Sequence, residues 1–592
     1  MKQFLDLNPK FQDFLNEDSS EGNHREKEIF RETEIEQVTS WSYEEAFPQF
    51  EAIPISEAAM QTHMSNEKIG LVREFPFEAY CELNFRGKTS WGVKVPLTDI
   101  LSFSSNVIKK PLLKMNSKYH KSARQTFKNI LSYMKERSSS RPSIHHANKL
   151  LKIGMESPPE ICDEIYCQLV KQTNNNPKIK STLRAWTLFG ICSGVFAPSP
   201  NLRLPLLNHL VKIVENESQE ISSKTCYCIT RLEKIYQNGS RLVHPTEMEL
   251  KCMKAMRPIP IKVYLMSGSY ICMLIESYDN SNDLKCAVLR RLDISVSKFS
   301  YFGFYEYCEA SELEERYIED CELILDIISK WNENENPEAF KLVLKIRVWY
   351  TPGPKDIGSL CLLHIQSVFD VISCKIPVSL KIALLLGALK LHIDMGNSKQ
   401  LDAFLYQRLF NYIPERLIHL LAKEDWIAKL LQKRMSFDKY SKIEAQRKYL
   451  EVLSSEPLYG SNMFYLISYD LNEEITMLPY DVLLVINSNG AMIYTRDHRE
   501  ELLKFKYSEI SSWGVSKDMF ALIVAKGGAQ TQYMFKTVLA RVISSLMEAY
   551  VNKSLGRPIG QLPTQNTNLR KIGLQRELIT KFPRLQAELF KM

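Results

Sequence analysis

The spacing of hydrophobic and polar positions along this chain changes three times, which predicts four folded units in series. Apolar residues recur at helical spacing from about residue 75 to residue 250. The period falls to two after Pro258, returns to helical spacing at about residue 355, and falls to two again from about residue 461. The chain is therefore expected to hold a helical domain, a mixed unit, a second helical unit and a strand-rich unit.

The first helical unit is organised around residues 163–199, which predict two apolar helices joined by a polar turn. The turn holds Asn174, Asn175 and Asn176 followed by Pro177, a sequence that ends a helix. Helices are predicted at 117–137, 158–172, 180–192, 204–214 and 222–238.

The mixed unit predicts strand, strand, helix, strand, helix and strand, the order of a ubiquitin-like roll. Its first two strands flank a turn at Ser267 and Gly268, and Asn282 is the expected cap of its first helix. Its strands are predicted at 261–265, 271–275, 301–307 and 342–350, and its helices at 283–292 and 322–331. Helices of the next unit are predicted at 379–392, 401–409, 416–421, 425–431 and 439–453.

The last unit predicts seven strands and one long amphipathic helix, the order of a pleckstrin-homology or phosphotyrosine-binding fold. Asn489 and Gly490 lie between two of the strands and give the strongest short-range hairpin signal in the sequence. The strands are predicted at 463–469, 482–487, 492–495, 502–505, 510–515, 519–524 and 532–536, and the helix at 538–553.

The composition of the chain indicates the cellular compartment in which we expect the protein. The chain has 592 residues, no run of about 18 uncharged apolar residues, and no apolar core of a signal peptide at its start. Its 13 cysteines are an odd number scattered through apolar segments, which favours reduced thiols over a disulfide framework. We therefore expect a soluble cytoplasmic protein.

Charge is unevenly distributed along the chain, which the net charge of +7 does not show. Residues 1–60 hold fourteen Asp and Glu against five Lys and Arg, a net charge of −9, so this acidic leader precedes a basic body. Residues 109–152 hold twelve Lys and Arg and one acid, Glu136. Within the helix predicted at 117–137, a cationic stripe faces away from the apolar positions. The stripe is formed by Lys121, Arg124, Lys128 and Lys135.

Such a stripe is either a solvated face or a surface for an acidic partner. Nucleic acid is disfavoured as that partner, because the stripe has no aromatic platform or recognition-helix pattern. A second possibility follows from the charge asymmetry: the acidic leader could lie across residues 109–152 and compete with acidic partners.

Catalytic and metal-binding constellations are not indicated. The sequence has no GxxxxGKS/T phosphate loop, so it predicts no motor domain that hydrolyses ATP by that route. Cys226 and Cys228 have no partner pair at zinc-like spacing, and His145 and His146 have no nucleophile motif. We expect neither enzymatic activity nor a cofactor or metal.

Several of these motifs carry a resemblance to a known tandem. The sequence DEIYCQ, a turn ending in NP, and the pattern RxWxLxxxCxGxFxPS resemble the myosin tail homology 4 domain, with PLLK before them and NGSR after them. The three units that follow resemble a FERM module of three lobes, and residues 445–466 resemble the passage between its second and third lobes. The counterparts in this chain are 111–114, 163–172, Asn176, Pro177, Arg184, Trp186, Cys192, Gly194, Phe196, Pro198, Ser199 and 238–241.

The tandem is similar to the tails of unconventional myosins, most of all to the C-terminal tandem of class VII. This resemblance implies a multidomain α+β protein, with an all-helical domain followed by a ubiquitin-like roll, a helical bundle and a pleckstrin-like β-sandwich with a C-terminal helix. The implied domains are a leader at 1–71, a helical domain at 72–257, FERM lobes at 258–354, 355–460 and 461–555, and a basic amphipathic extension at 556–592.

The resemblance also implies a function. A non-catalytic tail module would bind cargo or adhesion-receptor peptides and microtubules, and would regulate its motor domain in cis by folding back. The alternative is a motorless adaptor that binds phosphoinositides at the membrane. Either protein would act in the cytoplasm, at the cytoskeleton and the membrane-associated cortex or protrusions.

Two surfaces are implied as binding sites. The microtubule or acidic-partner surface comprises Lys121, Arg124, Lys128, Lys135, Lys171, Lys178 and Lys180. The peptide groove of the third lobe lies between a strand with Ser511, Trp513 and Val515 and a helix with Val542 and Leu546. Trp513 and Val542 are equally compatible with an ordinary core.

Overall fold

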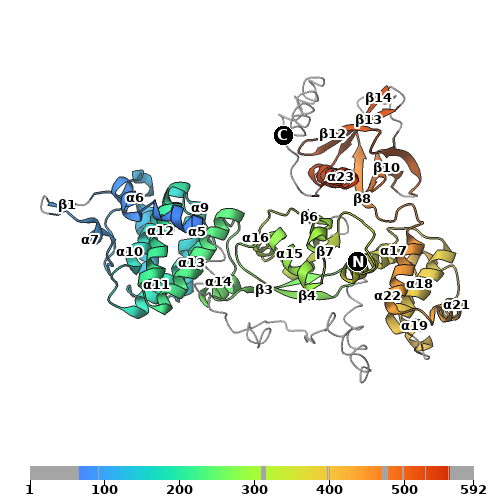
Figure 1. Cartoon of the computed structure of the whole chain (residues 1–592), viewed down its shortest axis with the longest axis horizontal. Helices are drawn as coiled ribbons and strands as arrows, with labels where there is room; N and C mark the ends of the chain where they lie inside the picture. The colour runs from blue at the N-terminus through green and yellow to red at the C-terminus, as the bar shows by residue number, and fades with distance from the viewer. Residues whose placement is uncertain are drawn as a thin grey trace.

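The computed structural model of the chain describes residues 66–557 and residue 559, apart from 88, 91–92, 309–314, 397, 399–400, 470–477, 497–498 and 527–528. A helical domain lies at one end, a mixed first lobe in the middle, and a helical second lobe and a β-rich third lobe at the other end (Figure 1). This order confirms the predicted α+β architecture. Among the helices that the structure describes, none combines the length and apolar character that a membrane span requires.

Most of the acidic leader and of the C-terminal extension lies outside the described residues. The first described helix is α5 (Asn66–Arg73), so its first six residues fall within the predicted leader. The regular structure of the chain therefore begins before Phe75, where the hydrophobic pattern first becomes clear.

The helical domain is built around α10 and α11, which confirm the predicted pair. Tyr166 of α10 and Trp186 and Phe189 of α11 are almost completely buried. The sequence pattern missed the other helix at the centre, α9, whose buried stripe includes His146 and Gly154 and so gives a weak apolar signal. The domain comprises α5 (Asn66–Arg73), α6 (Phe77–Asn84), β1 (Thr89–Ser90), β2 (Val93–Lys94), α7 (Leu97–Leu101), η1 (Ser117–Tyr119), α8 (His120–Tyr133), α9 (Ser143–Glu156), α10 (Pro159–Thr173), α11 (Ile179–Ser193), α12 (Pro200–Asn216), α13 (Gln219–Asn238) and α14 (Glu247–Lys254).

Polar motif residues of α10 join distant segments of this domain. The Asp163 carboxylate accepts hydrogen bonds from the backbone N–H and the hydroxyl of Ser199, the N-cap of α12, at 2.8 and 2.6 Å. The Tyr166 hydroxyl donates to the carbonyl of Phe196 at 2.6 Å. Because buried polar groups need such partners, these residues fix the chain path after α11.

The first lobe is a five-stranded sheet, in the order β4-β3-β7-β5-β6, with α15 and α16 packed on one face. β3 and β7 are parallel, as a ubiquitin-like roll requires, and every other neighbouring pair is antiparallel. The cap of α15 is Asn280, which forms a capping box with Asp283; the predicted cap at Asn282 was wrong by two residues. The lobe comprises β3 (Ile259–Tyr264), β4 (Tyr270–Ile275), α15 (Ser281–Arg291), η2 (Val296–Tyr301), β5 (Phe302–Cys308), β6 (Arg316–Ile318), α16 (Ile324–Trp331), η3 (Pro337–Ala339) and β7 (Phe340–Ile346).

The second lobe is a bundle around α18, which contacts α21 and α22. The predicted helices of this lobe are present, and the structure adds α17, whose mostly apolar sequence gives no clear amphipathic stripe. The lobe comprises α17 (Ile357–Ile372), α18 (Leu380–Met395), α19 (Asp402–Arg408), η4 (Leu409–Asn411), α20 (Glu415–Ile418), α21 (Lys423–Arg434), η5 (Met435–Phe437) and α22 (Lys442–Leu453).

The third lobe confirms the seven predicted strands and the closing helix. Its sheet has the order β11-β10-β9-β8-β14-β13-β12, and β9 and β10 form the predicted hairpin. Gly490 begins β10 at a φ of +145°, and a side chain there would overlap the Phe505 carbonyl. The lobe comprises β8 (Asn462–Ser468), β9 (Asp481–Asn487), β10 (Gly490–Thr495), β11 (Glu501–Lys506), β12 (Ile510–Val515), β13 (Met519–Lys526), β14 (Ala529–Lys536) and α23 (Ala540–Ser554).

The second and third lobes share one apolar surface through β9. Val482, Leu484 and Ile486 belong to the core of the third lobe. Leu483 and Val485, which point to the other face of the strand, belong to the core that the first and second lobes form. β9 is thus buried on both faces, which explains its almost unbroken apolar sequence.

A buried polar joint connects the helical domain to the first lobe. Arg241 donates from Nε to Asp326 at 2.5 Å and from Nη1 to Glu249 at 2.8 Å. Arg231 pairs with Glu276 and donates to the Ser277 hydroxyl at 2.5 Å. Both guanidinium side chains are fully buried, so the joint holds two paired charges that have no access to water.

Candidate interaction surfaces

The predicted cationic stripe lies on the solvent side of α8. Lys121 and Arg124 are exposed and Lys128 is half-buried, while Ala123, Phe127 and other apolar residues of the helix face the core. Spacings of three and four residues place the three cations within about 60° around the helix. The arrangement can hold an anionic surface, because its positive charges point the same way.

Lys135 does not lie on this helix. α8 ends at Tyr133, and Lys135 follows its cap in the left-handed region, at a φ of +64°. The prediction of one helix from 117 to 137 was therefore too long at its C-terminal end. Lys135 is exposed at the turn that follows, so it extends the stripe beyond the helix.

The turn before α11 lies beside the end of α8. The Lys178 ammonium pairs with the Glu136 carboxylate at 2.8 Å, and Arg184 donates to the carbonyl of Met134 at 3.1 Å. Burial opposes ionisation of Glu136, but the hydrogen bonds from Lys178 and Ser181 hold its pKa below the ordinary value. These contacts join the two predicted parts of the surface, and the one acid of residues 109–152 is neutralised by Lys178.

Lys171 is not part of any surface, which corrects the prediction for this residue. Its side chain is buried, and its ammonium donates to the carbonyls of Ile100, at 2.6 Å, and Ser102. The residue ties α10 to the end of α7. We call the remaining set the basic surface: Lys121, Arg124, Lys128, Lys135, Lys178 and Lys180.

The predicted groove lies beside an edge strand. Among the strands that the structure describes, β12 pairs only with β13, and α23 packs against it. Since Ser516 and Met519 close the hairpin through a backbone hydrogen bond, the backbone groups of Trp513 point away from β13. An extended peptide could therefore add to this edge as a further strand.

Trp513 occupies the space between β12 and α23. Its indole N–H donates to the Ser544 hydroxyl at 3.0 Å, and its ring packs against the core of the third lobe. Leu546 is almost fully buried, whereas Val542 is half-buried and Ser511 is exposed. The predicted groove stays a candidate, which we call the strip beside β12: Ser511, Val515 and Val542 lie at or near the surface of the lobe, and Trp513 and Leu546 pack in its core.

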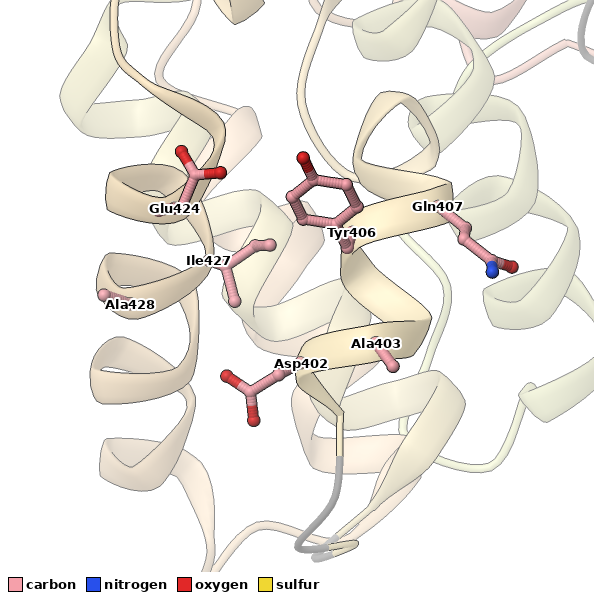
Figure 2. Close-up of a pocket in the computed structure, with 7 residues that line it drawn as sticks. All are labelled: Asp402, Ala403, Tyr406, Gln407, Glu424, Ile427 and Ala428. Carbon is pink, nitrogen blue, oxygen red and sulfur yellow. The ribbon is translucent and has the colours of Figure 1, made fainter.

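A cleft of about 500 Å³ in the second lobe was not predicted. Figure 2 shows Asp402 and Tyr406 of α19 on one side and Glu424 and Ile427 of α21 on the other. The Lys423 ammonium lies 4.2 Å from the centre of the Tyr406 ring. Two carboxylates in a lining that also holds Ala403, Ile427 and Ala428 suit a cation rather than an acidic partner. Asp402 and Glu424 are 22 residues apart, so no sequence signal indicated the pair.

Metal binding has no candidate in the described ranges, where no three His, Cys, Asp and Glu side chains come together in a suitable way. His145 and His146 pack edge to face, with ring centres 5.8 Å apart. A hydrogen bond of 2.8 Å joins Nε2 of His146 and the Ser139 hydroxyl. Both residues lie on α9.

Comparison with known families assigns each folded unit. The MyTH4 domain family matches residues 147–252, and the RA like domain family matches residues 257–348. The FERM central domain matches residues 355–464, and the PTB domain (IRS-1 type) matches residues 466–555. The matches follow the order of the helical domain and the three lobes.

The chain is similar in sequence to parts of both a myosin and a kinesin-like protein. Unconventional myosin-VIIb of Mus musculus is 24% identical over 77% of this chain, and kinesin-like protein KIN-14I of Oryza sativa subsp. japonica is 23% identical over 78%. The aligned parts are 22% and 38% of these relatives, so the chain spans less than half of their length.

Solved structures share the fold at low sequence identity. The human myosin 7b C-terminal MyTH4-FERM domain, solved in complex with the harmonin-a PDZ3 domain, aligns with a TM-score of 0.60 at 20% identity. It covers 81% of this chain and 96% of its own. A MyTH4-FERM domain of Dictyostelium discoideum myosin VII aligns with a TM-score of 0.65 at 21% identity, over 83% and 99% of the two chains.

Proposed function

Because this chain is a MyTH4 domain followed by a three-lobed FERM module, we propose that it is a non-catalytic tail module of an unconventional myosin. In this proposal it binds cargo peptides and microtubules, and regulates its motor by folding back. The observation that carries the proposal is the basic surface. The similarity to a kinesin-like protein supports microtubules as the filament.

The charge of the basic surface suits an acidic polymer. All twelve cations of residues 109–152 are exposed except Lys128, which is half-buried. A single exposed ion pair contributes about 0–1 kcal/mol, so affinity requires several pairs acting together along a repeating acidic surface. Screening lengths of about 8–10 Å at physiological salt make such binding strongly dependent on ionic strength.

Cosedimentation with microtubules tests this role. Lys121→Glu, Arg124→Glu and Lys128→Glu together should lower binding at least tenfold, and added salt should lower wild-type binding. A matched control reverses Lys429, Lys433 and Lys439, exposed cations of the second lobe, and should bind like wild type. If the two triple variants pelleted equally with microtubules, the basic surface would be only a solvated face and the proposal would be contradicted.

The strip beside β12 is proposed as the site for cargo peptides. An added strand would bond to the backbone of β12, and its apolar side chains would rest on Trp513 and Val542. The complex of human myosin 7b with a PDZ domain supports the proposal that modules of this fold take protein partners.

Binding of the harmonin-a PDZ3 domain provides a first assay for this site. Val542→Glu places a charge at the strip and should weaken a partner that uses it by about tenfold. Val538→Glu is the control, because Val538 is 71% exposed just before α23. A partner that binds the two variants equally well uses another surface.

A second candidate function is binding to phosphoinositide membranes. Its support is a pair of cations between the first and third lobes: the ammonium groups of Lys298 and Lys553 lie 5.2 and 5.9 Å from the centre of the Tyr301 ring. Burial and the charge of Lys298 lower the pKa of Lys553, so an anion at this place would be favourable. Lys298→Gln should then reduce binding to vesicles that contain phosphatidylinositol bisphosphate, whereas Lys429→Gln should not.

A further inference from the structure

The outer face of the first-lobe sheet carries tyrosines and cations in place of the usual polar mixture. Alternate residues of β3 and β7 point to the core, and those between them point outward. The outward positions of β3, β4, β5 and β7 bring five residues together at the end near the β3–β4 hairpin. This tyrosine-lysine face consists of Lys262, Tyr264, Tyr270, Tyr307 and Lys341.

Cations and rings are stacked within this face. The Lys262 ammonium lies 4.7 Å from the centre of the Tyr270 ring, and the Lys341 ammonium lies 5.2 Å from the Tyr264 ring. The two rings are tilted against each other at 5.5 Å. All five side chains are half-buried, so the cations are partly removed from water.

The ammonium groups of this face lie in a partly buried setting. Burial lowers the pKa of Lys262 and the neighbouring Lys341 adds to that effect, whereas Cys272 and Glu338 oppose it. Toward the second lobe the same sheet face is covered, because Met266 and Val343 pack with Phe369 of α17 and the rings of Tyr264 and Tyr307 pack against this cluster. A ligand would therefore approach from the side of β3 and β4, which Figure 1 shows in the middle of the molecule.

A matching segment exists in the chain itself. Residues 32–57 contain seven glutamates and no lysine or arginine. Within them, residues 41–51 combine Glu44, Glu45 and Glu51 with four aromatic residues, and Pro48 disfavours a helix. An extended segment with acids and rings can place carboxylates on the ammonium groups and rings on the tyrosines.

We propose that the tyrosine-lysine face binds residues 41–51 of the same chain. The tether is long enough: fourteen residues lie between residue 51 and the start of α5 at Asn66, and they can span about 50 Å. A folded domain of the size of this helical domain has a radius of gyration of only about 16 Å.

This docking site differs from the basic surface of α8. The cations there are mostly exposed and have no aromatic neighbours on the stripe, so each pair with a leader carboxylate would contribute little. The tyrosine-lysine face offers aromatic contacts and partly desolvated charge together. The leader would then act as a resident competitor for acidic aromatic peptides of other proteins.

Zero-length carbodiimide cross-linking of the full chain tests the contact, because it joins a carboxylate to a lysine amine only when the two touch. Mass spectrometry should find Glu44, Glu45 or Glu51 joined to Lys262 or Lys341. Lys262→Arg with Lys341→Arg keeps the charge but should abolish those products. Products at Lys118, Lys121 or Lys128 alone would overturn the proposal, and so would products that join two differently isotope-labelled chains.

A binding assay in trans gives an independent outcome. A synthetic peptide of residues 32–57 should bind a full chain whose own leader carries Glu44→Gln, Glu45→Gln and Glu51→Gln. Lys262→Glu with Lys341→Glu in that chain should weaken the peptide at least tenfold, with the melting temperature as the check of folding. Lys429→Glu with Lys433→Glu is the matched control, and equal binding to both double variants would contradict the proposal.

Discussion

At the scale of single residues, the motif that identifies the helical domain is explained by contacts rather than by chemistry. Gly194 has an ordinary φ of −97°, so backbone freedom does not require glycine there. A Cβ at this position would overlap the guanidinium of Arg231, and the Gly194 carbonyl accepts a hydrogen bond from Ser277 at 2.6 Å. The glycine allows the first lobe to approach α11.

Gly194→Ala should therefore disturb the joint between the helical domain and the first lobe. Arg231 is held by Tyr227, Ser277 and Glu276 and cannot move without losing these partners. We expect a loss of about 2–4 kcal/mol in the free energy of unfolding, measured by chemical denaturation. Gly353→Ala, where nothing lies within 4 Å of the added carbon, should be neutral. Equal stability of the two variants would contradict this account.

His209 gives the chain an acid-sensitive position. It packs on Phe77 at 5.2 Å between ring centres, and burial lowers its pKa to about 4. The pKa of His209 in the folded state lies below the unfolded value of about 6.5. Its contribution to the stability of the folded state is therefore fully present above pH 6.5 and is lost as pH falls through 4. Between pH 7 and pH 4 the free energy of unfolding of wild type should fall because of this histidine. In His209→Leu that fall should be smaller by up to about 3 kcal/mol, measured by chemical denaturation at each pH. Parallel pH profiles would exclude the role.

At the scale of elements, one buried carboxylate positions the segment before α8. Glu164 of α10 accepts hydrogen bonds from the backbone N–H groups of Leu112 and Leu113 at 2.9 and 2.8 Å. Gln168 donates to it as well, at 2.8 Å. The PLLK motif and the DEIYCQ motif, which start 52 residues apart, are thus two sides of one contact.

Glu164→Gln should destabilise the helical domain by about 2–3 kcal/mol. The amide that replaces one carboxylate oxygen can only donate, so a buried backbone N–H loses its acceptor and faces another donor. Thermal unfolding monitored by circular dichroism measures the change. Glu160→Gln, on an exposed position of the same helix, is the control and should unfold like wild type.

At the scale of the whole molecule, the helical domain and the FERM module are joined by charge rather than by an apolar core. The apolar cluster of the helical domain is separate from the cluster of the first two lobes, apart from Cys252 of α14, which packs in the latter. Asp326 accepts from Arg241 and also from the backbone N–H groups of Leu242 and Val243, at 2.9 and 3.1 Å. The position of the helical domain relative to the first lobe therefore depends on these pairs.

Asp326→Ala should loosen this relation without unfolding the lobes. The variant leaves Arg241 with Glu249 as its remaining carboxylate partner, and breaking a buried pair costs about 3–5 kcal/mol. Limited proteolysis should then cleave between residues 239 and 258, and calorimetry should show two transitions. Glu333→Ala, an exposed change just after α16, is the control. A single transition in both variants would contradict the expectation.

The sequence by itself determined the order of the four units, the pair α10 and α11, and the seven strands of the third lobe. Each of these elements has a local cause, such as helical or two-residue periodicity, a turn sequence or a hairpin signal, and so can be read without knowledge of contacts. Local patterns were weaker at α9 and α17, where the apolar stripe is interrupted or absent, and both helices were missed.

Only the tertiary structure decided which charges reach a partner. Lys171 and Lys178 both lie in the predicted cationic set, yet Lys171 is buried among carbonyls while Lys178 pairs with Glu136 at the surface. The tyrosine-lysine face likewise exists only because the sheet brings β3, β4, β5 and β7 together, from residues up to 79 positions apart. Burial and pairing depend on residues distant in the chain, whereas periodicity depends on neighbours.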